Sequence, residues 1–210
     1  MPSRLCEKSC SRKTNHLYGS SGIPRDKESS FYVALLKSCA SKKDLNDGIK
    51  IHATVLQKGL LDKSSYVGNS VVSMYVKCGA LRKAEEVVQE LPIRDVVTWN
   101  VLITGFSQQK RYIEALDCFV SMQGEGLSPD EVTFICALKA CGSIRDVYKG
   151  KQIHDKIVRA RFLDKDILLG TALVDMYAKC GELAKARQVL EGLQNRNVVT
   201  WSTLIEGYTQ

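Results

Sequence analysis

The sequence lacks several features that would place it in other classes of protein. Its eight cysteines include no Cys-x-x-Cys pair, which excludes zinc-ribbon and thioredoxin-like motifs. No run of 18 or more apolar residues occurs, so no membrane-spanning helix and no membrane partner are expected. Only 4 prolines are present, too few for a Pro-rich linker. With 44% hydrophobic and 25% charged residues, the composition is typical of a folded chain.

Motifs for catalysis are missing as well. None of the three histidines is followed by x-Glu, which a zinc-dependent deaminase needs beside its Cys-x-x-Cys. There is no Gly-rich phosphate loop and no Ser nucleophile elbow. No apolar signal-peptide core lies near Met1, so the thiols are expected to stay free in a reducing compartment. The sequence therefore predicts a protein that binds without catalysing and holds neither a metal nor a cofactor.

A long internal duplication is the main positive feature. Shifted by 102 residues, Ser29–Gln108 aligns with Glu131–Gln210 without a gap, and 32 of the 80 pairs are identical, or 40%. Ordinary residue usage would give a match at about one pair in sixteen. The blocks Met-Tyr-x-Lys-Cys-Gly and Val-Val-Thr-Trp occur in both copies. The chain therefore consists largely of repeats.

A finer period lies within this unit. The expected motifs are Ser29–Ser64, Ser65–Asp95, Val96–Asp130, Glu131–Asp166, Ile167–Asn197 and the partial motif Val198–Gln210. In the motif from Val96, the apolar residues Trp99, Leu102, Ile103 and Phe106 recur at the spacing of one helical face, and a second helix is expected over about residues 112–122. Ala84, Ala115 and Ala186 share one position of the second helix, where a small side chain lets two helices approach closely.

Helical pairs of 31 to 36 residues in tandem indicate an all-α fold, an α-solenoid of helix-turn-helix repeats over residues 29–210. Residues 1–28 show no periodicity and scatter Lys and Arg among Ser, so an unstructured arm and a possible targeting segment are expected there. Of the formal charge of +7, this arm carries +3, which leaves a modest excess of +4 over the repeats. That excess permits a polyanionic partner without requiring one.

The residues of the repeat resemble a known family. Val96-Val-Thr-Trp99-Asn100-x-Leu102-Ile103-x-Gly105-Phe106, followed by Glu114-Ala115-Leu116-x-x-Phe119-x-x-Met122 and Gly126-x-x-Pro129-Asp130, strongly resembles the pentatricopeptide repeat. The tetratricopeptide pattern overlaps in part, but its Leu-Gly pair is Leu102-Ile103 here. The order of lengths 36, 31 and 35 resembles the long, short and standard motifs of the plant PLS subclass, without the deaminase-like domain that ends many of its members.

The resemblance implies a right-handed superhelix that binds single-stranded RNA at about one nucleotide per motif. It implies that the fifth and last residues of a motif together read one base, and that the second residue wedges between bases. The reading pairs carried over in this way are Asn69 with Asp95, Asn100 with Asp130 and Thr171 with Asn197, with Ser202 in the partial motif. The wedges would be Tyr66, Val97, Val132, Leu168 and Val199, of which aromatic Tyr66 could stack.

In the two long motifs the corresponding pairs are Val33 with Ser64 and Ile135 with Asp166, and an aliphatic side chain cannot read a base edge. Asn with Asp resembles a uridine pair, Thr with Asn an adenosine pair, and Ser a purine reader. The expected RNA therefore runs 5′ to 3′ as U, U, any base, A and a purine. The alternative is that Asn or Ser near a helix start only caps that helix.

Two Cys-His pairs in the sequence could suggest a metal site. His52 and His154 each follow a cysteine, Cys39 and Cys141, by 13 residues. Because the two pairs lie 102 residues apart, we interpret both histidines as one recurring position of a second helix, with no metal role.

The resemblance also implies a function in a mitochondrion or chloroplast, in organellar RNA processing and most specifically in cytidine-to-uridine editing. An editing deaminase or another editing factor would then act in trans. Five or six registers are too few to address one transcript, so we expect either such a partner or a chain that is a fragment of a longer protein. The alternative function is a protein-interaction scaffold whose groove takes a peptide.

Overall fold

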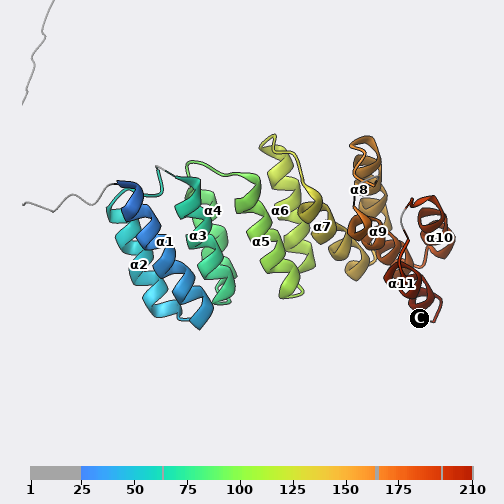
Figure 1. Ribbon diagram of the computed structural model, residues 1–210, viewed down its shortest axis with the longest axis horizontal. Coiled ribbons are helices and arrows are strands. Elements are labelled where there is room, and N and C mark those ends of the chain that lie inside the picture. Colours follow the sequence, from blue (N-terminus) through green and yellow to red (C-terminus); the bar gives the residue numbers. More distant parts are fainter. Residues whose placement is uncertain (1–24, 63, 164–165, 195, 210) are drawn as a thin grey trace, which may run out of the picture.

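The computed structural model describes residues 25–62, 64–163, 166–194 and 196–209. In these residues the chain forms eleven helices and no strand, as an elongated stack (Figure 1). The helices are α1 (Arg25–Lys42), α2 (Leu45–Gln57), α3 (Ser65–Lys77), α4 (Leu81–Glu90), α5 (Val96–Gln108), α6 (Tyr112–Gly124), α7 (Glu131–Ile144), α8 (Val147–Arg159), α9 (Ile167–Lys179), α10 (Leu183–Gly192) and α11 (Val198–Tyr208). The predicted all-α solenoid is confirmed.

The helices form two layers. The odd-numbered helices pack in chain order, α1 on α3, α3 on α5, and so on to α11, as one continuous row. Each even-numbered helix packs on the odd-numbered helix before it and on the one after it. Within the residues that the structure describes, no even-numbered helix packs on another. The odd-numbered helices, which are the first helices of the motifs, therefore form one uninterrupted layer. The even-numbered helices, which are the second helices of the motifs, form the other layer and, in the described part of the chain, do not contact one another.

Local sequence signals mark the start of each first helix. α3, α5, α7, α9 and α11 begin at the first residue of an expected motif, and the residue before each of them is its N-cap. Those caps are Ser64, Asp95, Asp130, Asp166 and Asn197, whose side chains accept a hydrogen bond from a backbone N–H of the first turn. The last residue of each of these motifs thus has a structural task at the start of the next one.

The N-terminal boundary differs from the expectation. α1 begins at Arg25, four residues before the boundary at Ser29. The rest of the arm, residues 1–24, lies outside the described residues. Among the described helices, none is both long enough and apolar enough to cross a membrane.

The core lies between the two layers. Trp99, Leu102, Ile103 and Phe106 are all buried, as their spacing predicts. Ala84, Ala115 and Ala186 are each 0% exposed, so the small-residue position of the second helix is confirmed. On α6, Leu116 and Phe119 are buried while Ile113 and Val120 point to solvent, so only part of its apolar sequence faces the core.

Candidate nucleic-acid interface

The expected wedge residues lie in one exposed row along the first helices. Their exposed fractions run from 52% to 64%, high for apolar side chains, and the five are Tyr66, Val97, Val132, Leu168 and Val199. Each is the second residue of its helix, and consecutive first helices pack side by side. In each motif from Ser65 onward, the structure therefore places one such group at a regular interval on the surface of the first layer.

Asn100 is held from two sides by the start of the next motif. Its Nδ2 donates to the Asp130 carboxylate, at 3.0 Å from Oδ1 and 2.8 Å from Oδ2. Its Oδ1 accepts from the hydroxyl of Thr133 at 2.5 Å. Asp130 caps α7 by accepting the backbone N–H of Thr133 at 2.9 Å. The same side chain thus starts one helix and holds the fifth residue of the helix beside it.

The same arrangement recurs one motif earlier. Asn69 Nδ2 donates to the Asp95 carboxylate at 3.1 and 3.2 Å, and Asn69 Oδ1 accepts from Thr98 Oγ1 at 2.5 Å. Asp95 and Thr98 also form a capping box at the start of α5. The pairs inferred from the repeat, Asn69 with Asp95 and Asn100 with Asp130, are therefore in direct contact.

The network determines which way each amide points. A carboxylate can only accept hydrogen bonds, so the NH2 group of the asparagine must face the aspartate. The hydroxyl of Thr133 lies 2.5 Å from the amide oxygen and 2.7 Å from Asp130 Oδ1, and an amide oxygen has no hydrogen of its own, so at this distance it accepts from the hydroxyl. One lone pair on the amide oxygen then remains for a ligand. The side chain therefore presents an acceptor, the amide oxygen, next to a donor, the NH2 group.

Both aspartates stay ionised at neutral pH. Burial works to raise the pKa of Asp130, but the hydrogen bonds from the Thr133 backbone, the Thr133 hydroxyl and Asn100 outweigh it and lower that pKa below its ordinary value. For Asp95, burial likewise opposes the hydrogen bonds from Thr98 and Asn69, and the net effect again lowers the pKa. The negative charge that orients each amide is therefore present throughout the physiological range.

A groove of about 350 Å³ opens beside Asn100. Val97 and Val132 lie in its walls, one from α5 and one from α7, with Asn100 between them along the chain. Four polar side chains that the sequence analysis did not single out also line it: Ser73 and Lys77 of α3, and Thr104 and Gln108 of α5. Thr104 and Gln108 follow Asn100 by four and eight residues, so helical periodicity alone could have placed them on this face.

The third pair is arranged differently. Thr171 donates to the carbonyl of Ile167 at 2.9 Å and lies 3.0 Å from the hydroxyl of Thr200. Thr200 in turn donates to Asn197 Oδ1, which caps α11. Thr171 and Asn197 are therefore connected through Thr200, whereas the two Asn-Asp pairs touch. Ser202 is exposed on α11.

The two aliphatic fifth residues differ from the polar ones in position as well as in chemistry. Val33 is only 3% exposed and belongs to the core, and Ile135 is half-buried. Their partners Ser64 and Asp166 cap α3 and α9 through backbone N–H groups. Neither long motif presents a polar reader at its fifth residue.

Capping does not account for the asparagines. Ser64 caps α3 and Asp95 caps α5, so Asn69 and Asn100 lie inside their helices. The alternative that they serve only as caps is wrong. Their side chains extend instead to the start of the next first helix.

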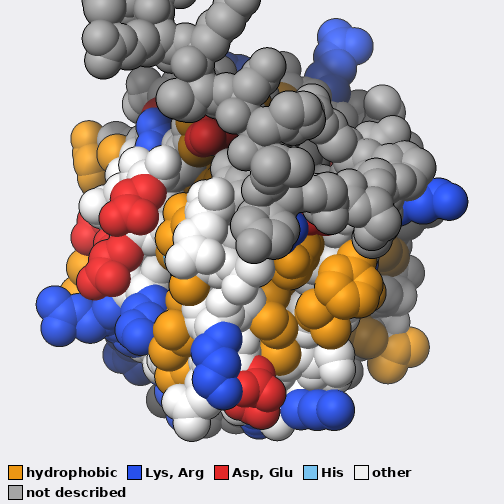
Figure 2. Space-filling view, turned by 90° about the vertical axis from the view of Figure 1, so that its left-hand side faces the viewer, with side chains coloured by type: hydrophobic (Ala, Val, Ile, Leu, Met, Phe, Trp, Pro, Cys, Tyr) orange, Lys and Arg blue, Asp and Glu red, His pale blue; other side chains and the backbone are white. Residues whose placement is uncertain are grey.

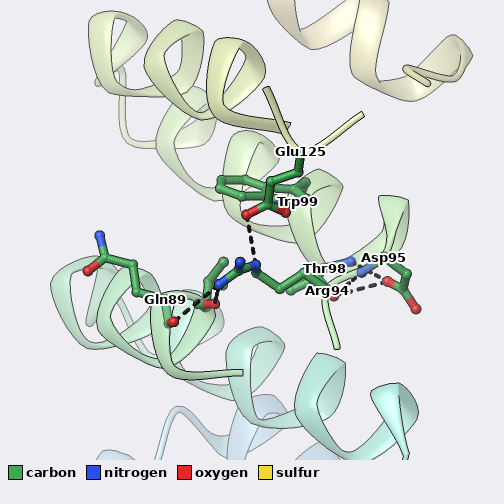
Figure 3. A network of polar contacts seen from close by, with 7 residues as sticks. Gln89, Arg94, Asp95, Thr98, Trp99 and Glu125 are labelled. Carbon is green, nitrogen blue, oxygen red and sulfur yellow. Dashed lines mark hydrogen bonds and ion pairs between the residues drawn. The ribbon is translucent and has the colours of Figure 1, made fainter. Parts of the chain in front are cut away.

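A second network holds the loop that carries Asp95 (Figure 3). The Arg94 guanidinium contacts Glu125 at 2.8 Å and donates to the carbonyl of Gln89 at 3.1 Å. Glu125 also accepts from the indole N–H of Trp99 at 3.0 Å. The end of α4, the start of α5 and the end of α6 are thereby joined at the residue before the cap.

The histidines occupy one recurring position, as expected. Nδ1 of His52 in α2 lies 3.0 Å from the hydroxyl of Tyr75, and Nδ1 of His154 in α8 lies 2.9 Å from that of Tyr177. No group of three or more potential metal ligands occurs in the described part of the chain. Beside His154, between α8 and α10, lies a second hollow of about 500 Å³ that contains Lys151, Asp155, Lys185 and Gly192 among its lining residues.

Comparison with protein families identifies the repeats. Residues 94–143 match a profile of the PPR repeat family, and residues 69–96 and 171–198 match the PPR repeat itself. The chain carries pentatricopeptide repeats. The resemblance read from the motif of Val96 is therefore confirmed for the family.

Curated relatives agree with this assignment. A mitochondrial pentatricopeptide repeat-containing protein of Arabidopsis thaliana is 39% identical over 85% of this chain, and a chloroplastic one is 37% identical over 85%. This chain spans 17% of the first and 28% of the second, so it corresponds to a minor part of these pentatricopeptide repeat proteins.

Solved structures show the same solenoid. The pentatricopeptide repeat protein PPR10, in complex with an 18-nt psaJ RNA element, is similar with a TM-score of 0.64 at 22% identity, covering 85% of this chain and 27% of that one. The PPR domain of Arabidopsis thaliana protein-only RNase P 1, in complex with tRNA, is similar with a TM-score of 0.66 at 14% identity, covering 87% and 99%. At these identities the likeness concerns the fold of the pentatricopeptide repeats alone.

Proposed function

We propose that this chain binds single-stranded RNA selectively, with its first helices facing the bases, and that it does so without catalysis. The observation that carries the proposal is the repeated asparagine held by aspartate and threonine beside a groove with aliphatic walls. An oriented amide can donate to and accept from a base edge, and Val97 and Val132 can cover the two faces of that base. RNA complexes of proteins with this fold support the choice of ligand.

The proposed base preferences follow the polar fifth residues. Asn69 and Asn100 select uridine, Thr171 selects adenosine and Ser202 selects a purine, while the motif of Ile135 accepts any base. Selection from a random RNA pool tests this order directly. Recovery of RNAs without uridine at the two asparagine registers would refute the assignment.

A swap of the reading pair is the sharper test. Because Thr171 works with Asn197 and Asn100 works with Asp130, the matched variant is Asn100→Thr with Asp130→Asn. We expect it to prefer adenosine at that register and to lose about 1–3 kcal/mol for uridine. Asn197 already caps α11, so asparagine at position 130 can keep the start of α7 intact. Unchanged preference for uridine would show that position 100 does not read the base.

At the level of the cell, we propose a role in organellar RNA processing, as a specificity factor in cytidine-to-uridine editing. Relatives named mitochondrial and chloroplastic support an organelle, and the order of motif lengths supports the PLS subclass. An editing deaminase or another editing factor would act in trans. Plants that lack the protein should lose conversion at particular cytidines, and normal conversion at every site would exclude this role.

The hollow beside His154 favours a second candidate, a protein-interaction scaffold. It lies between two second helices and mixes apolar walls with Lys151, Asp155 and Lys185, which suits a peptide with polar side chains. Binding of RNA through phosphate contacts weakens steeply with salt. A partner protein that stays bound at high salt and in excess RNA would favour the scaffold.

A further inference from the structure

Lys37 and Tyr66 form a contact between α1 and α3, the first helices of the first two motifs. The ammonium of Lys37, on α1, donates to the hydroxyl of Tyr66, on α3, at 2.9 Å. The same nitrogen lies 5.2 Å from the centre of the tyrosine ring. It is therefore closer to the hydroxyl edge than to the ring centre, which leaves ring surface free. The side chain of Tyr66 is 54% exposed.

Both residues lie on the face that forms the proposed RNA groove. Tyr66 occupies the second position of its motif, as Val97 and Val132 do in the groove beside Asn100. Lys37 follows Val33 by four residues, as Thr104 follows Asn100, and Thr104 lines that groove. Because the motifs repeat, we infer that Lys37 and Tyr66 lie at the register of Val33 where Thr104 and Val132 lie at the register of Asn100.

The register of Val33 has no polar reader, because Val33 is buried and Ser64 caps α3. A lysine and an aromatic ring offer a different kind of contact there. An aromatic face stacks on any base, and an ammonium that gives one N–H to Tyr66 keeps two for a phosphate.

Charge elsewhere makes this contact more important. Seen from the end that carries α1 and α2, the coloured side chains of the described residues mix basic, acidic and hydrophobic types and show no broad basic patch (Figure 2). On α9, Asp175 and Lys179, the counterparts of the groove residues Ser73 and Lys77 in the duplication, are paired at 2.7 Å. A weakly basic solenoid depends on individual cations at the groove rather than on an overall field.

We propose that Lys37 and Tyr66 form a nucleotide-binding site that takes any base at the 5′ end of the RNA, by stacking on Tyr66 and by a phosphate contact from Lys37. This inference rests on the proposed RNA-binding function. It assigns to the first long motif a contribution to affinity without base selectivity.

The second copy of the duplication supplies a matched control. Lys139 and Leu168 stand 102 residues after Lys37 and Tyr66, and both are exposed. The lysine is retained there, but Leu168 takes the place of Tyr66, so no aromatic ring lies at the second position of α9 to hold it. The variant Tyr66→Leu therefore converts the first site into the second, and Lys139→Gln controls for the loss of a charge.

The experiment measures the affinity of the full chain for a six-nucleotide RNA. This RNA consists of one variable nucleotide at the 5′ end followed by the five nucleotides of the proposed sequence. We expect Tyr66→Leu to weaken binding about five-fold or more, the lower range for loss of one stacked base. An RNA with an abasic first nucleotide should weaken binding to the wild-type chain and make no difference to Tyr66→Leu. Changing the first base should alter the affinity of the wild-type chain by less than about two-fold.

The lysine has its own readout. Lys37→Gln should reduce the slope of log affinity against log salt by about 0.7, the value for one phosphate on a single strand. Lys139→Gln should reduce it less, since no ring positions that ammonium. Thermal unfolding of all variants should match the wild type because the three side chains are exposed.

The outcomes separate the two proposals. If the wild-type chain binds the RNA and Tyr66→Leu and Lys37→Gln leave affinity and salt slope unchanged, the Lys37–Tyr66 site is refuted while the base-reading proposal stands. If the wild-type chain does not bind single-stranded RNA, the proposed function itself fails, and with it this inference.

Discussion

Replacing Asp130 by asparagine tests how an amide acquires its orientation. Asp130 has two tasks, since it caps α7 and accepts from Asn100. Asparagine keeps the first, because Asn197 caps α11 through the same contacts with Thr200. It disrupts the second, because its NH2 group would face the NH2 group of Asn100. We expect the Asn100 amide to turn over and to present its donor and acceptor in reversed order.

The magnitudes of the two effects differ. A hydrogen bond to a charged group contributes about 1.5–3 kcal/mol and a neutral one about 1 kcal/mol, so exchanging one for the other should lower the free energy of unfolding by about 1 kcal/mol. For a chain of this size that corresponds to about 2–4 °C in Tm. Discrimination between bases at this register should fall by about 1–3 kcal/mol, or roughly 5- to 150-fold.

Fluorescence anisotropy with labelled RNAs that differ only at the Asn100 register measures the discrimination, and thermal unfolding measures stability. Asp95→Asn is the matched control, because it should change the preference one register away and leave the Asn100 register intact. A variant that keeps its preference for uridine at the Asn100 register within about two-fold would refute the argument that the carboxylate sets the amide's orientation.

Two further perturbations concern stability. Gly105→Ala should lower the free energy of unfolding by about 1–3 kcal/mol, because an added Cβ would lie 2.6 Å from Val76 Cγ1. In Gly124→Ala, on α6, the added Cβ meets nothing within 4 Å, so this variant should be neutral or raise the free energy of unfolding by up to about 1 kcal/mol. Chemical denaturation of the two variants measures both effects. Burial lowers the pKa of His52 and of His154, so folding favours the neutral rings, and stability should fall as pH drops from about 7 towards 5, where the unfolded chain takes up the protons. Changing both histidines to glutamine should flatten the pH dependence of the unfolding free energy over that range, and an equally steep dependence would show that other groups cause it.

The helices and their registers could be predicted because the signals are local. The face of Trp99 and Phe106 follows from the helical period, and the start of α7 follows from Asp130 three residues before Thr133, a capping pair readable in the sequence. The duplication adds a second reading of each motif, so an assignment in one copy is checked by the other. The pairing of Asn100 with Asp130 came from the family resemblance, and the structure shows the contact.

Other features depended on how neighbouring motifs stack. The sequence shows that position 33 is aliphatic, but its burial follows from the packing of α1 on α3. The threonine of each network was not singled out, because Thr133 lies 33 residues from Asn100 and reaches it only across two adjacent helices. The start of α1 at Arg25 was missed because no repeated copy marks that boundary.

By itself the sequence determined the repeat, the helical pairs and the residue types at each position, since these depend on periodicity and on contacts within one turn. Only the tertiary structure decided what those residues can do. Three features each depend on atoms from different helices: the amide orientation of Asn69 and Asn100, the contact between Lys37 and Tyr66, and the hollow beside His154. Their geometry is set by the distance and angle at which one motif packs on the next, and no local pattern encodes that.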